Sequence, residues 1–342
     1  MDKKLLISVK EDMNCYLWYA LKLAILDPEN SINYRDWFYS HFINPITYCY
    51  KNSNTYKLDY IEYFDELKIF GEVLDIEVYM FDKAIKNEVV KCFIDHITNG
   101  KYLEIEVDYY YLSDSRHYQS IHYTHPVLVY GYSNNHFDIV SFVDNVYKSM
   151  RIEFDELRVA YNNALEINSN LSEAIIAYRV ITKKSECIKK YNVNSFISEI
   201  DNCREGKGHI DTSIKFPKGL NNIAPIKIGF RAYLEMIKCM KNYDHRLHAD
   251  YRAIHFMYEQ NIQLYKRIMY WKDFLNITQT DIINCLDIIK QCNLLRMIFL
   301  KRQLKYNKGS INDHPEEFKF FAQRMEDILK MEQDIWDKIC CV

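Results

Sequence analysis

Apolar and polar residues follow a two-residue period in several stretches of the first half of the chain. Residues 102–107 alternate in this way directly after Gly100, which predicts a β-strand that begins at a turn. Continuous β-branched and aromatic runs at residues 126–132 and 137–143 are separated by two asparagines, which predicts an antiparallel hairpin. Residues 147–152 predict a further strand. Together these stretches indicate an antiparallel sheet.

A helical period replaces this alternation along the rest of the chain. Residues 154–161 show it first and residues 194–203 show it again, whereas the apolar run at residues 174–181 predicts a strand. Long helices are predicted at residues 226–242, 247–275, 278–307 and 315–339.

The change of period predicts an α+β protein with two domains. Residues 1–165 form the first domain, which contains the antiparallel sheet and a helix that begins near Cys15. Residues 166–223 form a connection that can add one strand to this sheet, and residues 224–342 form an α-helical bundle domain. The amphipathic helices are compatible with a homodimer, but packing within one chain explains them equally well.

The composition limits the classes of partner. The 342 residues are 49% apolar and carry a formal net charge of -3, and no basic run is interleaved with aromatic residues, so we expect no nucleic-acid partner. No stretch of about 18 apolar residues is free of charges, and the apolar stretch at the N-terminus is too short for a signal peptide. We therefore expect no membrane partner and a cytoplasmic location.

The ten cysteines are scattered along the chain. They lack Cys-x-x-Cys spacing, which predicts neither a zinc ribbon nor a disulfide framework. His117, His122 and His125 are close together, but no cysteine or carboxylate stands at ligand spacing from them. We expect no bound metal and no bound cofactor.

Cys15 stands where polar residues give way to a helical pattern. Unsatisfied N–H groups and the helix dipole favour negative charge at a helix N-terminus, so a thiol there is biased toward the nucleophilic thiolate. The same N–H groups can hold an oxyanion. The alternative is a small apolar residue on an amphipathic helix.

His125 and Asp144 give Cys15 two chemical partners. His125 opens the first strand of the hairpin and Asp144 directly follows the second, so an antiparallel reversal brings their side chains together. A carboxylate that orients an imidazole lets the imidazole accept a thiol proton. We therefore expect Cys15, His125 and Asp144 to form a catalytic triad. His122 is the competing base, or it lines an acyl channel.

The order of these motifs resembles the papain-like cysteine peptidase superfamily, in particular its bacterial branches that process peptides or acyl chains. The likeness is closer to the butirosin biosynthesis protein H-like family. The segments that carry it are Asp-Tyr-Tyr-Tyr-Leu at 108–112, Tyr118, His122, His125, Asp144-Asn145, residues 154–161, 229–234 and 264–267.

This resemblance implies a papain-like first domain that acts as an acyltransferase. An acyl or peptidyl chain would arrive as a thioester on the phosphopantetheine arm of a carrier protein, move to Cys15, and pass to a small amine to form an amide bond. A diamine, an amino sugar and an amino acid are all open as acceptors. The family implies specialised-metabolite biosynthesis, including antibiotics and nonribosomal peptides. The alternatives are peptide or amide hydrolysis by the same triad, and a binding protein without catalysis.

One departure from the papain pattern concerns the oxyanion hole. Papain-like peptidases place a glutamine shortly before the cysteine, but residues 1–14 contain none. Asn14 or Lys10 can substitute, or the Cys15 N–H can act with another backbone donor; loss of one donor typically costs about 100- to 1000-fold in rate. A thioester is more reactive than an amide and tolerates a weaker hole.

Two further groups have open roles. The tyrosines at 109–111 are either the packed end of a strand or, through a ring such as that of Tyr110, a surface for an aromatic acyl chain. Residues 244–250 and Glu259 either bind a cationic amine or a carrier phosphate, or belong to an ordinary solvated helix start.

Overall fold

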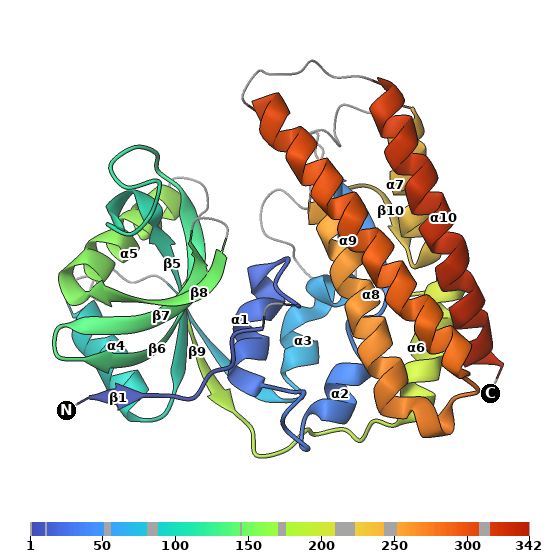
Figure 1. The fold of residues 1–342 in the computed structure, drawn as a ribbon. Coiled ribbons are helices and arrows are strands. Elements are labelled where there is room, and N and C mark those ends of the chain that lie inside the picture. Colours follow the sequence, from blue (N-terminus) through green and yellow to red (C-terminus); the bar gives the residue numbers. More distant parts are fainter. Residues whose placement is uncertain are drawn as a thin grey trace. The chain divides into compact units, whose positions relative to one another are not determined.

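The computed structural model describes residues 2–10, 12–50, 56–80, 88–143, 146–169, 176–208, 223–242, 252–307 and 315–341 (Figure 1). The chain folds into two compact units. The first comprises Met1–Arg35 and Leu67–Lys189, and the second comprises Asp36–Glu66 and Lys190–Val342. Helices and antiparallel sheets occur together, which confirms the α+β class.

The first unit is built on one antiparallel sheet, which contains every strand predicted for it. Its order is β4 (Leu74–Met80), β9 (Ile176–Lys183), β5 (Tyr102–Asp108), β6 (Thr124–Ser133), β7 (His136–Val143) and β8 (Val146–Glu153), and β1 (Lys3–Lys4) pairs with β6. Asn134 adopts the left-handed conformation (φ 50°) that the tight β6–β7 turn requires. The strand predicted at 174–181 is β9, inserted between β4 and β5.

Two helices cover one face of this sheet. Alternate strand residues such as Ile105, Val127 and Val129 share a buried apolar core with α4 (Val89–Thr98) and α5 (Phe154–Ser169). Strand residues one position away point to the other face, because side chains alternate along a strand.

The helix α1 (Leu17–Leu26) crosses that other face. The buried ammonium of Lys22 lies 2.6 Å from Glu104 Oε2, and Arg179 Nη1 lies 2.6 Å from Glu104 Oε1. Burial would raise the pKa of Glu104, but the charges of Lys22 and Arg179 hold it below its ordinary value. This buried ion triad fixes α1 against β5 and β9.

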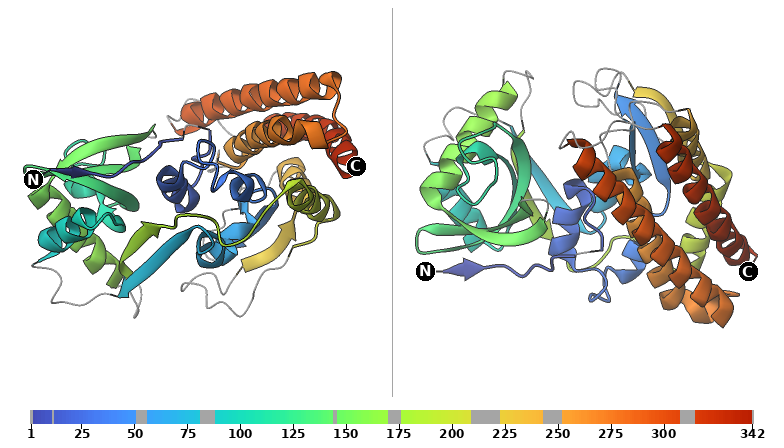
Figure 2. Two further views of the ribbon diagram at one scale, coloured as in Figure 1. Left: turned by 90° about the horizontal axis from the view of Figure 1, so that it is seen from below. Right: turned by 45° about the horizontal axis from the view of Figure 1, so that its top comes forward.

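The second unit combines a small sheet with a helical bundle. The sheet has the order β10 (Ile223–Ile228), β2 (Pro45–Tyr50) and β3 (Tyr56–Tyr60). The helices are α6 (Val193–Glu205), α7 (Phe230–Lys241), α8 (Arg252–Trp271), α9 (Gln279–Asn307) and α10 (Pro315–Cys340), and two short helices, α2 (Arg35–Tyr39) and α3 (Glu66–Phe70), lie where the chain passes between units. Figure 2 shows the bundle from two further directions.

Two sequence expectations differ from this arrangement. The helix expected from residue 226 begins only at Phe230, because residues 223–228 form β10. Residues 36–66, which we expected in the N-terminal domain, belong to the second unit, because β2 pairs with β10 and β3 packs against α8. Part of the expected helix at 247–275 lies outside the described residues, which resume at Arg252.

Gly229 allows the sharp change from β10 to α7. Its φ is +64°, and a Cβ there would lie 2.0 Å from the carbonyl oxygen of Cys203. We therefore expect Gly229→Ala to lower the free energy of unfolding by about 3 kcal/mol or more, measured by urea denaturation. Gly100→Ala is the matched control: its φ is +77°, but nothing lies within 4 Å of the added Cβ, so we expect a loss of only about 1 kcal/mol. Equal losses would contradict the steric argument.

Within the described ranges, no helix has both the length and the apolar character needed to cross a membrane.

Candidate functional site

Cys15 lies directly before the start of α1. Tyr16 is the N-cap residue, in an extended conformation, and its side chain makes no capping hydrogen bond. The first turn of α1 contains no acidic residue. The Cys15 side chain is largely buried, with 7% of the residue exposed. The thiol therefore sits at a helix N-terminus whose N–H groups are not satisfied by the N-cap side chain, a setting that favours an anion.

Two hydrogen bonds fix the direction of α1 across the sheet. Ala20 O accepts a hydrogen bond from Tyr147 Oη at 3.0 Å, in the strand β8. Leu26 O, at the other end of the helix, accepts from Lys183 Nζ at 3.0 Å, at the end of β9. The N-terminus of α1 is thus directed toward the sheet edge where β5 ends, β6 begins and β7 ends. His125 belongs to this edge, but the alternation along β6 puts its side chain on the face of α4 and α5, opposite the face that α1 crosses.

His125 is the second residue of β6. It pairs with Val107 in β5, and alternation along the strand puts it on the side of Val127, which faces α4 and α5. Its ring stacks on Tyr123 with centroids 5.3 Å apart and meets Tyr109 edge-on at 6.0 Å. The β6–β7 register, continued to the start of β6, sets His125 opposite the last residue of β7. Asp144, the expected orienting carboxylate, lies outside the described residues.

A second histidine at the same sheet edge has a clear carboxylate partner. His122 Nδ1 lies 2.6 Å from Oδ2 of Asp108, the last residue of β5. Asp108 is fully buried, and its Oδ1 accepts the N–H groups of Tyr110 and Tyr123, each at 3.1 Å. The His122 ring stacks on Tyr110 with centroids 4.2 Å apart, while its side chain is 55% exposed. This is the geometry in which a carboxylate fixes the tautomer and direction of an imidazole.

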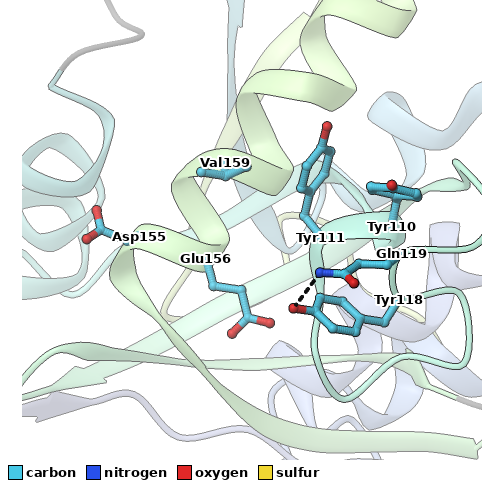
Figure 3. A pocket seen from close by; sticks show the side chains of 7 residues that line it. All are labelled: Tyr110, Tyr111, Tyr118, Gln119, Asp155, Glu156 and Val159. Carbon is cyan, nitrogen blue, oxygen red and sulfur yellow. Dashed lines mark hydrogen bonds between the residues drawn. The ribbon is translucent and has the colours of Figure 1, made fainter.

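One of the two expectations for the tyrosines at 109–111 was that they form the packed end of a strand, and the structure does not show this. They form a short 3-10 helix, and Asp108 caps it. Tyr110 lies between the His122–Asp108 pair and a hollow of about 350 Å³. Figure 3 shows the side chains around this hollow, which are those of Tyr110, Tyr111, Tyr118, Gln119, Asp155, Glu156 and Val159. The aromatic lining leaves Tyr110 available as a contact surface.

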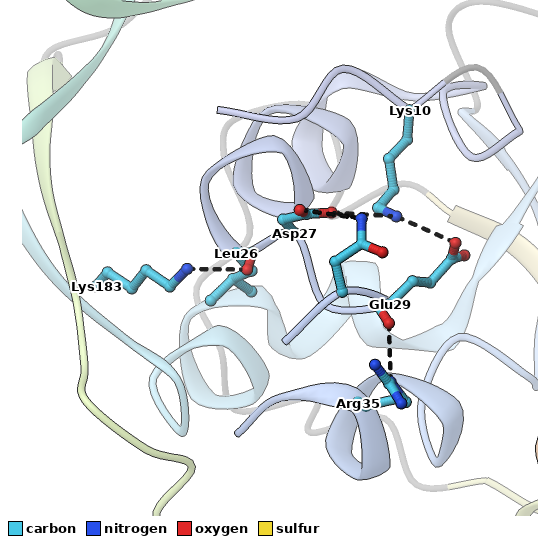
Figure 4. A network of polar contacts seen from close by, with 7 residues as sticks. Lys10, Leu26, Asp27, Glu29, Arg35 and Lys183 are labelled. Atoms are coloured by element: carbon cyan, nitrogen blue, oxygen red, sulfur yellow. Dashed lines mark hydrogen bonds and ion pairs between the residues drawn. The ribbon is translucent and has the colours of Figure 1, made fainter. Parts of the chain in front are cut away.

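The two substitutes considered for the missing oxyanion glutamine have local roles. Asn14 Nδ2 donates to Lys10 O at 3.3 Å. The Lys10 ammonium lies 3.7 Å from Asp27 and 3.3 Å from Glu29, beyond the C-terminal end of α1 (Figure 4). A ten-residue helix is about 15 Å long, so Lys10 is directed away from Cys15 and does not fit the role of an oxyanion donor.

Other cysteines of the chain lie in settings that disfavour the thiolate. Burial raises the pKa of Cys203 and of Cys292 well above the ordinary value, and it raises the pKa of Cys285 to about 12. These thiols stay protonated near neutral pH. All three belong to the core of the helical bundle.

The helical residues considered for ligand binding are not a solvated surface where they are described. Glu259 is fully buried, and its Oε1 lies 3.4 Å from His255 Nε2. It therefore serves the bundle interior, while residues 244–250 lie outside the described ranges. Among the described residues, no group of three or more His, Cys, Asp or Glu side chains is arranged to hold a metal ion.

Of the predicted site residues, the structure joins His122 and Tyr110 in direct contact. It sets α1, which Cys15 precedes, and the side chain of His125 on opposite faces of the sheet. The partnership of Asp108 with His122 was not predicted from the sequence. A signal for it exists, because Asp108 ends the alternating strand that pairs with the strand after His122. A scan against protein-family models finds no match to this chain, and a search of curated proteins finds no matching relative.

Proposed function

We propose that the protein is a papain-like cysteine acyltransferase that forms an amide bond. An acyl or peptidyl chain, presented as a thioester on the phosphopantetheine arm of a carrier protein, would pass through Cys15 to a small amine. The observation that supports this most is the position of the largely buried Cys15 directly before α1, whose N-cap residue Tyr16 makes no side-chain capping hydrogen bond.

The proposed proton steps use the expected triad, with His125 as the base. His125 takes the Cys15 proton and the thiolate attacks the thioester carbonyl. The carrier sulfur then leaves as a thiol with the proton that His125 returns. The acceptor amine then attacks the acyl-enzyme and gives a proton to His125, and the Cys15 sulfur is released. Asp144 stabilises the imidazolium in this scheme. A cytoplasmic location is part of this proposal.

The N–H groups of Cys15 and of the first turn of α1 would hold the oxyanion of each tetrahedral intermediate. The N-cap residue Tyr16 does not occupy them with its side chain, and Lys10 is engaged at the far end of the helix. Backbone donors alone suit a thioester, whose carbonyl is more reactive than that of an amide.

The test is to detect the acyl-enzyme by intact-protein mass spectrometry. We expect incubation with an acyl-carrier thioester to add one acyl mass at Cys15, and a diamine or amino sugar to discharge it as an amide. Cys15→Ser should abolish thioester adduct formation, and Cys92→Ser, which removes another thiol of the same unit, should leave it intact. Rapid release of free acid in the presence of amine would identify a hydrolase with the same nucleophile. Absence of any Cys15 adduct would refute the enzymatic proposal.

A further inference from the structure

The helix α9 has apolar residues on two opposite sides. One row, spaced by three or four residues, is buried in the bundle: Cys285, Ile288, Cys292, Leu295 and Phe299. Phe299 contacts Phe321 of α10 with ring centroids 5.0 Å apart, and α8 packs along the same helix. Figure 1 shows α9 as one unbroken helix beside these two neighbours.

The second row, which we call the outer seam, is exposed. Its apolar members are Ile283, Leu286, Leu294, Met297 and Leu304, each about half exposed, at 47–61%. Lys290 and Lys301 complete a regular series with spacings of three or four residues. A helix that is apolar on both sides is typically buried on both sides, and a sustained seven-residue repeat is typical of helix pairing.

The order of the outer seam suits pairing with an identical helix that runs in the opposite direction. We place a two-fold axis between Asn293 and Leu294. It sets Ile283 opposite Leu304 of the second copy, Leu286 opposite Lys301, and Lys290 opposite Met297. Leu294 lies opposite Asn293 of the second copy, beside the axis, and each other member of the seam faces a seam residue of the second copy. A parallel arrangement would instead set each lysine against its own copy, with like charges opposed.

The antiparallel arrangement also brings opposite charges together. Asp287, next to Leu286, comes beside Lys301 of the second copy, and the symmetry repeats this ion pair. If each apolar side chain of the seam offers roughly 100 Å², two copies bury about 1,000 Å² in total, which is where specific interfaces begin.

We propose that the outer seam of α9 binds a second copy of this chain and forms an antiparallel, two-fold symmetric dimer. The inference does not depend on the proposed acyl transfer. A second copy would cover the outer seam, which is the longest row of exposed apolar residues on the described helices.

The first test is the solution mass by light scattering at tens of micromolar chain. We expect twice the chain mass of 41.2 kDa. Leu294→Glu sets two carboxylates across the axis and should weaken the dimer about 100-fold, to a monomer at this concentration. Leu234→Glu, at an exposed position of α7, is the matched control and should stay dimeric. A monomeric parent chain, or a dimeric Leu294→Glu variant, would refute the proposal.

The second test distinguishes the orientation and does not depend on affinity. In a Cys341→Ser background, which removes an exposed thiol, the double variant Ile283→Cys/Leu304→Cys should form intermolecular disulfides under mild oxidation. Ile283→Cys alone should form no intermolecular disulfide, because residue 283 lies opposite Leu304 of the second copy. Efficient cross-linking of the single variant would overturn the antiparallel arrangement. Circular dichroism of each variant confirms that the bundle is folded.

Discussion

His125→Ala is expected to slow acylation of Cys15 on the order of 10³-fold, while His122→Ala changes it less than about threefold. The reason is that a general base contributes about 10²- to 10⁴-fold only when it accepts the reacting proton. In the proposed triad this base is His125, the second residue of β6. The measurement is the single-turnover rate of acyl-enzyme formation with a carrier thioester across pH 5 to 9.

His122→Ala is a well-matched control, because it removes an imidazole at the same edge that is oriented by a different carboxylate. The reverse result, in which loss of His122 or Asp108→Asn abolishes acylation and His125→Ala does not, would reassign the base to the His122–Asp108 pair. That pair has the better-defined geometry, with 2.6 Å between Nδ1 and Oδ2. Thermal unfolding of each variant separates a lost base from a lost ring contact, since His125 also stacks on Tyr123.

Glu332→Gln is expected to stabilise the protein strongly at alkaline pH. Glu332 is fully buried in α10, and burial raises its pKa from an ordinary 4.5 to about 8, with Asn261 beside it opposing part of this rise. The folded state therefore holds this proton more tightly than the unfolded state does. Ionisation of the buried Glu332 lowers the free energy of unfolding. This loss is absent below pH 4.5, grows as the pH rises toward 8 and is constant above that, where it reaches about 3–5 kcal/mol.

The measurement is urea unfolding of both proteins at pH 5 and pH 8.5. We expect the stability difference between Glu332→Gln and the parent chain to shift in favour of the variant by about 3 kcal/mol or more between these values. Glu316→Gln, at an exposed position of the same helix, should show no such shift. A shift below about 1 kcal/mol would mean that the bundle accommodates the charged carboxylate.

Local pattern was sufficient for most elements of the fold. The alternation at 102–107 and the runs around the two asparagines identified β5, β6 and β7, because each strand has one face in the core formed with α4 and α5. The long helices of the bundle were equally visible. In both cases the period of the apolar residues reports directly on the side that is buried.

Pairing between distant segments was not visible in the sequence. The second sheet joins β2 to β10, and nothing near either strand indicates the other. The partnership of His122 with Asp108 has the same origin, since it depends on the β5–β6 register. Glu259 looked like a surface acid because its burial comes from packing of the bundle. Catalysis by Cys15, His125 and Asp144 stays a prediction.

The pairing of Ile46 in β2 with Ile228 in β10 has a consequence for biosynthesis. The ribosome delivers β2 and β3 long before their third strand, while the whole of the larger sheet is completed in between. The β2–β3 hairpin therefore keeps the edge of β2 unpaired until β10 has been synthesised. A chain cut after Lys189 keeps β2 and β3 but lacks β10, so this fragment is expected to be prone to aggregation when it is expressed by itself.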